Sequence, residues 1–325
     1  MTGTGTISMS GGTTLLAGTG IFGNTTNWSF NNLTFGDGSA NATTAYETST
    51  ITVNGVLTVA SSHILNAGSK TWKLMGNGTP LVVSGTFTPQ TSTVSYENTT
   101  SANVTSTTYG NLQFSPASGT PTYTLLSGAL STSGNFTLAG VGNGTINAES
   151  NDPSIDVNGN FIVGAGDTFQ ASSTESFTIS DNLTNNGTFT ANTGTVTLDT
   201  TNASIIGGNG NPTITFNNLT SVIPAKTIQF TENLTFRVNG ILTLRGSGVS
   251  NLVINSTTGT QWLINHQGAE NVQFVSVTNS GCDGSSTQIN VYDGVNGGNN
   301  GTCWKFYEGV HLQMEGIRME GVKIE

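Results

Sequence analysis

Charged side chains are scarce in this sequence of 325 residues. Only 8% of the residues are Asp, Glu, Lys or Arg, far below the roughly 25% of an ordinary globular domain. The 8 basic residues are outnumbered by 18 acidic ones, and residues 1–225 contain only Lys70 and Lys73 as basic groups. A chain without a basic patch lacks the electrostatic footprint of a nucleic-acid binder, so we predict no nucleic-acid partner.

Helix formers and long apolar runs are also missing. Ala, Glu, Lys and Arg are scarce, and no window places apolar residues at helical spacing between capping residues, which argues against helices. No apolar run reaches the roughly 18 residues that a membrane-spanning helix needs, so we predict no direct membrane span. The opening MTGTGTISMSGG has neither the charged region nor the apolar stretch of a signal peptide.

The acidic residues and histidines do not form a recognisable catalytic motif. The acids are thinly scattered, and the groups we consider are Asp152 with Asp156, and Asp283 with Asp293, whereas glycoside hydrolysis needs two converging carboxyl groups. We therefore predict that the chain is not an enzyme. The three histidines have no evident Ser or Asp partner, and we interpret them as surface or packing residues: His63, His266 and His311.

Metal ligands are few, so we predict no cofactor. Two thiols and no suitably spaced His pair make a zinc site improbable. Asp37-Gly38 and Asp283-Gly284 offer carboxylates to Ca²⁺, but neither lies in an Asp-x-Asp-x-Asp array. We interpret both as turns and keep Ca²⁺ only as a weak alternative.

Small polar residues make up what the sequence does contain. Thr, Gly, Asn and Ser together account for more than half of the chain, and 34% of the residues are hydrophobic. A polar, low-complexity chain can be disordered. Here, however, the apolar residues are largely β-branched or aromatic and alternate with polar ones, as in ITVNGVLTVA (51–60) and GTVTLDT (194–200). This pattern favours an ordered all-β protein.

One strand pattern recurs along most of the chain. FNNLTF (30–35), YGNLQF (109–114) and FNNLTS (216–221) are the most visible copies. Ten consecutive intervals appear when each strand is aligned on an opening Gly or Asn, and they average about 26 residues, a length typical of repeat architectures. The aligned openings, after Gly5, are Asn31, Gly55, Gly85, Gly110, Gly134, Gly159, Gly187, Asn217, Gly240 and, more weakly, Glu270.

This period selects one architecture among the all-β folds. Sandwich strands recur about every 8–12 residues and propeller blades repeat at about 40–50. A period near 26 suits a single-stranded parallel β-helix, or β-solenoid, of about 11 coils, each stacked on the preceding one. The aligned Gly and Asn residues then form tight corners, where we expect a positive φ. Small polar residues before them are expected to stack into hydrogen-bonded ladders, among them Asn54, Asn158, Asn186 and Asn239.

The C-terminal part of the chain departs from the repeat. Cys282 and Cys303 are the only cysteines and both lie in this part, and we predict a disulfide formed in an oxidising compartment. We expect a solenoid domain over 1–280, a disulfide-stapled cap over 281–307, and an extended tail or linker over 308–325. The tail carries the near-repeat MEGIR, MEGVK. A free thiol pair is the alternative to the disulfide.

The sequence permits N-glycosylation and offers aromatic side chains to sugars. Sixteen Asn-x-Ser/Thr sequons are present, a mild excess over what the composition alone would produce. Those we single out are Asn24, Asn32, Asn77, Asn135, Asn218 and Asn300. The four Trp residues are predicted to pack in the core rather than to stack on sugars.

These repeated FNNLT and GNFT strands, with the stretch GTFTANTGTVTLD (187–199), resemble bacterial or archaeal cell-surface β-solenoids over about residues 1–280. That group includes filamentous-haemagglutinin-like and autotransporter-type adhesin stalks. The resemblance implies an extracellular or cell-surface protein with a structural or adhesive role, whose partners are copies of itself, a neighbouring cell surface or glycans. A carbohydrate-binding or phage-fibre-like module is the first alternative, and a polysaccharide lyase or hydrolase the second. An exported protein needs an export signal, so we interpret the chain as a mature form or a part of a longer protein.

Overall fold

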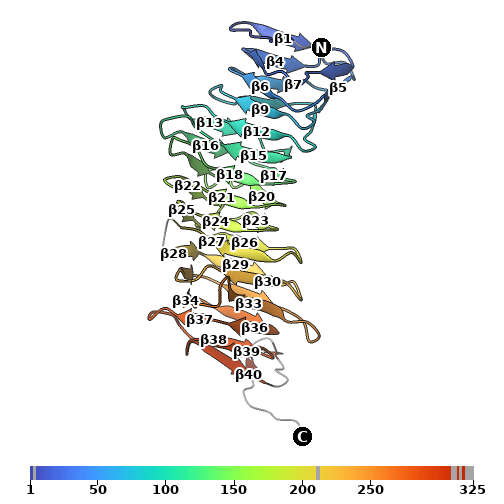
Figure 1. Ribbon diagram of the computed structural model, residues 1–325. Helices are drawn as coiled ribbons and strands as arrows, with labels where there is room; N and C mark the ends of the chain where they lie inside the picture. The colour runs from blue at the N-terminus through green and yellow to red at the C-terminus, as the bar shows by residue number, and fades with distance from the viewer. Residues whose placement is uncertain (3–4, 210–212, 309–312, 315–316, 319–325) are drawn as a thin grey trace. The chain divides into compact units, whose positions relative to one another are not determined.

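The structure is a computed structural model that describes residues 1–2, 5–209, 213–308, 313–314 and 317–318. Throughout these residues the secondary structure is β-strand, turn or irregular, with no helix and therefore none that is long and apolar enough to cross a membrane. Successive coils pair in parallel and form a β-solenoid of about 12 turns, which confirms the predicted fold class (Figure 1).

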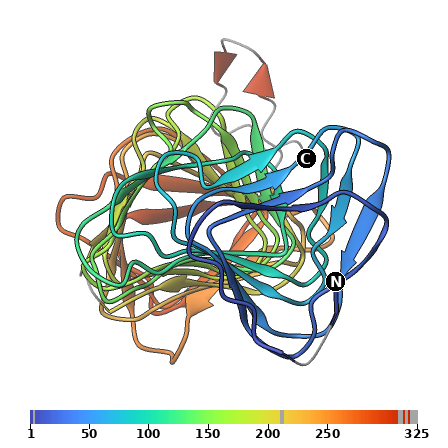
Figure 2. The same ribbon diagram turned by 90° about the horizontal axis from the view of Figure 1, so that it is seen from above.

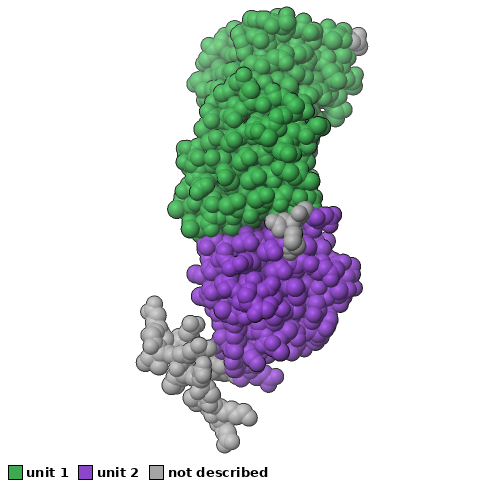
Figure 3. Space-filling model, turned by 90° about the vertical axis from the view of Figure 1, so that its left-hand side faces the viewer, with its two compact units in different colours: residues 1–179, 184–194 green, residues 180–183, 195–325 purple. Residues whose placement is uncertain are grey.

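The chain divides into two compact units. The first comprises residues 1–179 and 184–194, and the second comprises residues 180–183 and 195–325 (Figure 3). Each unit is built from three-sided coils, since every third strand along the chain pairs with the same sheet. Seen along the stack, the backbone of each unit winds around an interior (Figure 2).

In the first unit, one face runs through all the coils, and the other two faces each change sheets after the early coils. The continuous face contains β3 (Trp28–Phe30), β6 (Thr50–Val53), β9 (Thr71–Leu74), β12 (Thr93–Tyr96), β15 (Asn111–Phe114), β18 (Phe136–Leu138), β21 (Phe161–Val163) and β24 (Leu183–Asn185). The next face contains β1 (Thr13–Leu16), β4 (Asn32–Phe35), β7 (Leu57–Val59) and β10 (Leu81–Val83), then β13 (Ala102–Val104), β16 (Thr122–Leu125), β19 (Thr145–Asn147), β22 (Thr168–Gln170) and β25 (Thr188–Thr190). The third face contains β2 (Gly20–Phe22), β5 (Ala42–Ala45), β8 (Ile64–Asn66) and β11 (Thr86–Thr88), then β14 (Thr108–Tyr109), β17 (Ala129–Thr132), β20 (Ser154–Val157) and β23 (Ser176–Ile179).

The second unit repeats the three-sided plan. Its first face contains β27 (Ser204–Gly207), β30 (Thr227–Phe230), β33 (Leu252–Ser256), β36 (Val275–Thr278) and β39 (Val295–Gly298). Its second face contains β28 (Thr213–Phe216), β31 (Thr235–Val238), β34 (Trp262–His266) and β37 (Ser280–Cys282). Its third face contains β26 (Thr195–Leu198), β29 (Asn218–Ser221), β32 (Leu242–Arg245), β35 (Glu270–Gln273), β38 (Ile289–Tyr292) and β40 (Trp304–Tyr307).

Each coil is shorter than the period of the aligned strands suggested. On the continuous face of the first unit, β3 begins at Trp28 and β21 at Phe161, six coils later, which gives about 22 residues a coil, within the usual range of solenoid repeats. In the second unit, β27 and β39 begin four coils apart at Ser204 and Val295, which gives a similar length. One coil contains three strands, so aligned strands that belong to the same face are three strands apart. Four of the aligned intervals instead advance by four strands and end on the next face, which makes the average interval longer than the coil.

Alternation along each strand separates the core from the surface. In β15, for example, Leu112 and Phe114 are buried, while Asn111 and Gln113 face outward and are half-buried. Aromatic rings then stack from coil to coil inside the first unit, where the Phe136 ring centroid lies 5.5 Å from that of Phe114 and 5.4 Å from that of Phe161. Burying one such side chain contributes roughly 1.5–3 kcal/mol, so each coil is stabilised mainly by its immediate neighbours.

Parallel pairing continues through the segment that the sequence analysis assigned to a cap. Strands β38 and β40 pair over Ile289↔Trp304 to Tyr292↔Tyr307, and β36 pairs with β39 through a register shift. Of the predicted tail, the short strands β41 (Gln313–Met314) and β42 (Ile317–Arg318) pair antiparallel, and the other residues after 308 lie outside the described ranges. The predicted divisions at 280 and 308 stay predictions.

Candidate functional site

The aligned Gly and Asn residues from Asn31 to Gly240 all lie at corners, where the chain passes from one face to the next. They belong to different corners, however, so they do not form one column. Gly110, Gly134 and Gly159 share the corner that leads into β15, β18 and β21. In the first unit, Asn31, Gly55 and Gly187 lie where the chain passes from the continuous face to the next face, and Gly85 lies where it passes on to the third face. In the second unit, Asn217 and Gly240 lie between the second face and the third.

The glycines are required by close approach between coils rather than by a positive φ. None of these seven glycines, all within the described ranges, has φ in the left-handed region. A Cβ at Gly134 would instead overlap Oδ1 of Asn111 in the preceding coil, and a Cβ at Gly159 would lie 2.6 Å from the carbonyl carbon of Gly134. The backbone confirms how close the coils are, since the Gly134 N–H donates to the Gly110 carbonyl at 2.7 Å.

Beside Gly55, Gly134, Gly159 and Gly240, an asparagine side chain of one coil binds the next coil. Asn111, the third residue of YGNLQF, accepts a hydrogen bond at its Oδ1 from the Asn135 backbone N–H at 3.0 Å. Asn135 in turn accepts from the Asn160 N–H at 2.9 Å. The same contact occurs at the other two motif copies, from Val56 N–H to Asn32 at 2.8 Å and from Ile241 N–H to Asn218 at 2.7 Å. We call this pairing of an Asn with a Gly of the next coil the Asn–Gly corner.

A spacing signal for the Asn–Gly corner is present in the sequence but was not used in the alignment. At each motif copy, the Asn side-chain oxygen accepts a hydrogen bond from the backbone N–H of the residue that directly follows the Gly of the next coil. The separation in sequence is 24 from Asn32 to Val56, 24 from Asn111 to Asn135, and 23 from Asn218 to Ile241. Each separation spans one coil. An alignment that pairs each corner Asn with the Gly of the next coil therefore gives a period closer to the observed coil length than the alignment of strand openings does.

The small polar residues expected to form a ladder lie at different corners, and Asn54, Asn158 and Asn239 contact backbone carbonyls or side chains of other residue types. Asn158 Nδ2 donates to the Thr132 carbonyl at 3.0 Å, one coil back. Asn54 Nδ2 lies 3.3 Å from the Phe30 carbonyl, also one coil back. Asn239 accepts a hydrogen bond from the Arg237 guanidinium at 2.6 Å within its own corner. Asn186 occupies the corner that follows β24.

Several of the selected sequon asparagines form side-chain hydrogen bonds within the protein. The Asn218 Nδ2 donates to Thr195 at 3.2 Å, and the Asn300 Nδ2 donates to the Val277 carbonyl at 2.7 Å. Asn24 accepts from the Thr26 N–H at 2.6 Å. Asn77 has an exposed side chain that accepts a hydrogen bond from Thr100. Glycosylation of these residues stays a prediction, and it is sterically simplest at Asn77.

Cys282 and Cys303 form the predicted disulfide, with their Cα atoms 6.0 Å apart. The bond joins the end of β37 to the residue before β40, so it links two successive coils of the second unit. The Cys303 N–H also lies 3.0 Å from Cys282 Sγ. Cross-linking a loop of this length contributes about 3 kcal/mol under the chain-entropy model.

Two lysines are buried inside corners, which the sequence analysis did not foresee. Lys70 directly precedes β9, and its ammonium donates to the Asn24 carbonyl at 2.9 Å and to Ser49 at 2.7 Å. Lys226 directly precedes β30 and donates to the carbonyls of Thr200 at 2.9 Å and Asn202 at 2.6 Å. Burial lowers the pKa of both side chains. Each lysine satisfies polar groups of a preceding coil, so its role is structural.

The carboxylates are likewise held by protein donors. Asp37 accepts from the Ser39 N–H at 3.0 Å, and Asp283 accepts from the Ser285 N–H at 3.0 Å, so both form turns, and these hydrogen bonds lower the pKa of each carboxyl group. Asp167 is buried and accepts from the Gly144 N–H at 2.7 Å, and burial raises its pKa. Within the described residues no three His, Cys, Asp or Glu side chains come together as metal ligands would.

Both described histidines, and all four tryptophans, pack in the interior. His63 is fully buried, with Nε2 3.0 Å from the Thr43 hydroxyl, and burial lowers its pKa. His266 is also fully buried, with its two ring nitrogens within hydrogen-bonding distance of Thr287 and of the Ala269 carbonyl. His311 lies outside the described residues. The buried tryptophans are Trp28, Trp72, Trp262 and Trp304.

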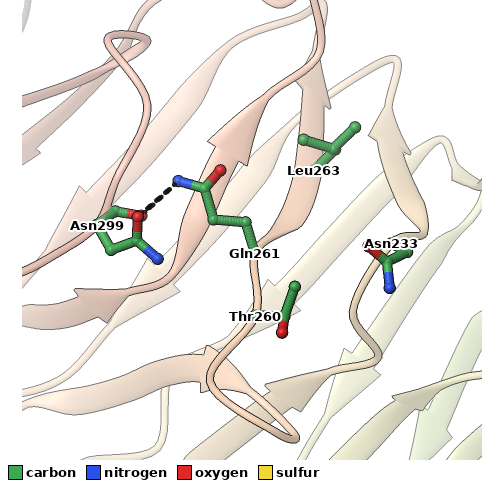
Figure 4. Close-up of a pocket in the computed structure, with 5 residues that line it drawn as sticks. All are labelled: Asn233, Thr260, Gln261, Leu263 and Asn299. Atoms are coloured by element: carbon green, nitrogen blue, oxygen red, sulfur yellow. Dashed lines mark hydrogen bonds between the residues drawn. The ribbon is translucent and has the colours of Figure 1, made fainter.

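A polar pocket opens on the second unit. It has a volume of about 490 Å³ and is lined by Asn233, Thr260, Gln261, Leu263 and Asn299 (Figure 4). The Gln261 Nε2 donates to the Asn299 carbonyl at 2.7 Å and lies 3.2 Å from the Asn299 Oδ1. Sequence reasoning did not find this pocket, because its residues come from segments far apart in the chain.

Comparisons with known proteins find no relative. No protein-family model matches the chain, and neither the curated proteins nor the solved structures contain a significant match. Of the expected resemblance to cell-surface β-solenoids, the structure therefore supports the β-solenoid fold alone. The resemblance to adhesin stalks stays a prediction.

Replacing Gly134 with Ala tests the Asn–Gly corner. We expect the free energy of unfolding to fall by about 1–3 kcal/mol, because the added Cβ overlaps Asn111 and overpacking costs that much. Gly18→Ala is the matched control, since a Cβ there meets nothing within 4 Å. Urea denaturation of both variants measures the difference. Equal stability of the two would contradict the close approach.

The buried His63 predicts a loss of stability in mild acid. Its pKa is lower in the folded than in the unfolded chain, so the unfolded state binds more protons as the pH falls from about 6.5 to the folded pKa. Stability should therefore decline across that window and level off below it. In His63→Gln, which does not titrate, this part of the decline should vanish in urea denaturation series at several pH values. An unchanged pH profile would refute the assignment.

Proposed function

We propose that this chain is a non-catalytic structural element of a cell surface, a stalk or filament subunit that assembles with copies of itself through its edge strands. The observation that carries the proposal is the repetitive, parallel stacking of coils over about 12 turns. In such a fold each coil contacts only its neighbours, so the solenoid elongates without needing a new core. Elongated spacing and attachment are the roles that this construction suits best.

The distribution of polar groups supports a structural role over a catalytic one. Outward positions carry mainly Thr, Ser and Asn, as in β16, where Thr122 and Thr124 face outward, and β26, where Thr195 and Thr197 do. The buried ionisable groups Lys70, Lys226 and Asp167 donate to or accept from the backbone of neighbouring coils. A catalytic site requires ionisable groups converging on an accessible cleft, and these groups serve packing instead.

An extracellular location fits the chemistry of the chain. The Cys282–Cys303 disulfide favours an oxidising compartment. A surface with few charges and many hydroxyl and amide groups is suited to contact with polar, uncharged material such as glycans. These features agree with the resemblance to surface β-solenoids in the repeated FNNLT strands.

Strands at the first coil supply the means of assembly. Strand β1 is the first strand of its sheet and pairs with β4. Strand β2 pairs with β5, and Met1 lies at its other edge, where the Met1 ammonium donates to the Ile21 carbonyl at 2.6 Å and the Gly23 N–H donates to the Met1 carbonyl at 2.9 Å. Pairing of a new strand with β2 would displace Met1. The outward side chains of β1 and β2 include Leu15 and Ile21, which are 54% and 50% exposed. An edge strand with exposed apolar residues is a template for another strand. Assembly through these strands would extend the parallel stack.

Electron microscopy and sedimentation of the purified chain test the proposal. We expect polymers whose length increases with protein concentration. Leu15→Lys combined with Ile21→Lys should prevent assembly, because charges on an edge strand block further pairing. Ile64→Lys is the control, since Ile64 is an exposed isoleucine on β8, which has β5 and β11 on either side.

Two results would contradict this mode of assembly. One is a single monomeric species at every concentration. The other is a Leu15→Lys, Ile21→Lys variant that polymerises as well as the Ile64→Lys control.

A further inference from the structure

The pocket on the second unit extends over four successive coils, three of which supply its lining residues. Asn233 comes from the corner before β31, Thr260, Gln261 and Leu263 from the corner and start of β34, and Asn299 from the segment after β39. In Figure 4 the side chains of Asn233 and Thr260 lie on one side of the hollow, and Gln261 reaches toward Asn299 on the other. The pocket is therefore a property of the stack and not of one loop.

The lining combines uncharged hydrogen-bonding groups with one apolar side chain. Two asparagines, a glutamine and a threonine provide donors and acceptors, and the lining contains no Asp, Glu, Lys or Arg. A charged ligand would find no counter-charge there. A ligand rich in hydroxyl groups, each of which both donates and accepts, matches amide and hydroxyl side chains better than any other common class.

Leu263 supplies the apolar part of the pocket lining from an outward position of a strand, where most residues are polar. It faces outward on β34, between the inward-facing Trp262 and Ile264, and its register neighbours on the same column are Thr235 and Gly281. A Cβ at Gly281 would lie 2.7 Å from Leu263 Cδ2, so the leucine side chain extends over the glycine. An apolar patch flanked by amides fits a sugar ring, whose C–H face is apolar and whose edge is polar.

Parts of the lining are held in place before any ligand arrives, the Asn299 amide by a side-chain hydrogen bond and Asn233 through its backbone. Asn233, Asn279 and Asn299 all have a positive φ, of 60°, 57° and 55°, a conformation that Asn tolerates better than most residues. The Asn299 Nδ2 donates to Asn279 Oδ1 at 2.9 Å, and the Asn233 N–H donates to the Gln261 carbonyl at 3.1 Å. Such pre-organisation reduces the entropy lost on binding.

We propose that this pocket binds one neutral sugar residue, with Asn233, Thr260 and Gln261 hydrogen-bonding its hydroxyl groups and Leu263 packing against its ring. The site goes beyond the proposed structural role and does not depend on assembly. A single sugar with about 12 non-hydrogen atoms should bind with a dissociation constant on the order of 1 mM, given the binding free energy typical of each ligand atom. Affinity for a glycan surface would then come from many copies acting together.

Nuclear magnetic resonance titration of the full-length Leu15→Lys, Ile21→Lys chain tests the site directly, because charges at the assembly edge keep the protein from polymerising. Asn233 begins the sequon 233–235, so the protein is produced in a host that does not glycosylate asparagine. The probes are the methyl glycosides of glucose, galactose, mannose and N-acetylglucosamine, with galacturonate as a charged comparison. We expect at least one neutral glycoside to shift the side-chain amide resonances of Asn233 and Gln261 in a saturable way, and galacturonate to shift them less.

Substitutions then separate the site from general surface binding. Leu263→Thr places on β34 the residue type that already stands at its neighbour Thr235, and it should weaken binding about tenfold by removing apolar contact. Ile162→Thr is the matched control, because Ile162 is an outward-facing apolar residue on β21 whose register partner is Thr137, and it should leave binding unchanged. Circular dichroism and urea denaturation establish that both variants fold.

Three results would overturn the proposal. The first is the absence of any shift at these amides at sugar concentrations on the order of 50 mM, where a millimolar site is nearly saturated. The second is equal binding by Leu263→Thr and Ile162→Thr in folded protein. The third is a preference for galacturonate over every neutral glycoside. All three are independent of whether the chain polymerises, so failure here leaves the structural proposal standing and failure of assembly leaves the sugar site standing.

Discussion

Close backbone contact between successive coils at their corners is the constraint on which the rest of the structure depends. At the Asn–Gly corners one coil offers an asparagine side chain, and the next offers a glycine whose missing Cβ leaves room for it. The contact fixes the register between coils, and register decides which side chains face inward. Aromatic and aliphatic side chains can then stack in the interior because the corners hold the coils at a constant spacing.

This constraint also explains why the composition is so uneven. Corners demand glycine and asparagine, strands favour threonine and other β-branched residues, and the solvent-facing positions need only short polar side chains. Charged residues have little place in such a scheme. The buried Lys70 and Lys226 fit it because each ammonium satisfies oxygen atoms of earlier coils. A protein built this way is suited to spacing and attachment, and it offers binding groups through outward columns and corners rather than through a deep cleft.

Periodicity in the sequence was sufficient to predict the fold class, and the presence of only two cysteines predicted the disulfide, but the sequence analysis predicted neither the coil length nor the pocket. Strands on all three faces share the same pattern of an opening Gly or Asn followed by apolar residues. An alignment can therefore slip from one face to the next, as it does at Gly85 and Gly187, without any local sign of error. Only the contact between Asn111 and Gly134, and its equivalents, distinguishes one coil from the next. The pocket had a weaker signal still, because coil stacking alone brings Asn233 and Asn299 beside the outward-facing Leu263.

Disulfide trapping measures the coil length, and with it the central claim, most directly. Thr71 and Thr93 face outward and are register partners on β9 and β12, so their Cα atoms should lie within the roughly 4.4–6.8 Å that a disulfide requires. Glu97 is the residue that the longer period of the aligned strands would place beside Thr71, and it lies four positions beyond Thr93, or about 13 Å at the rise of a strand. The account predicts rapid oxidation of the Thr71→Cys, Thr93→Cys variant and little oxidation of the Thr71→Cys, Glu97→Cys variant. The reverse order would contradict it.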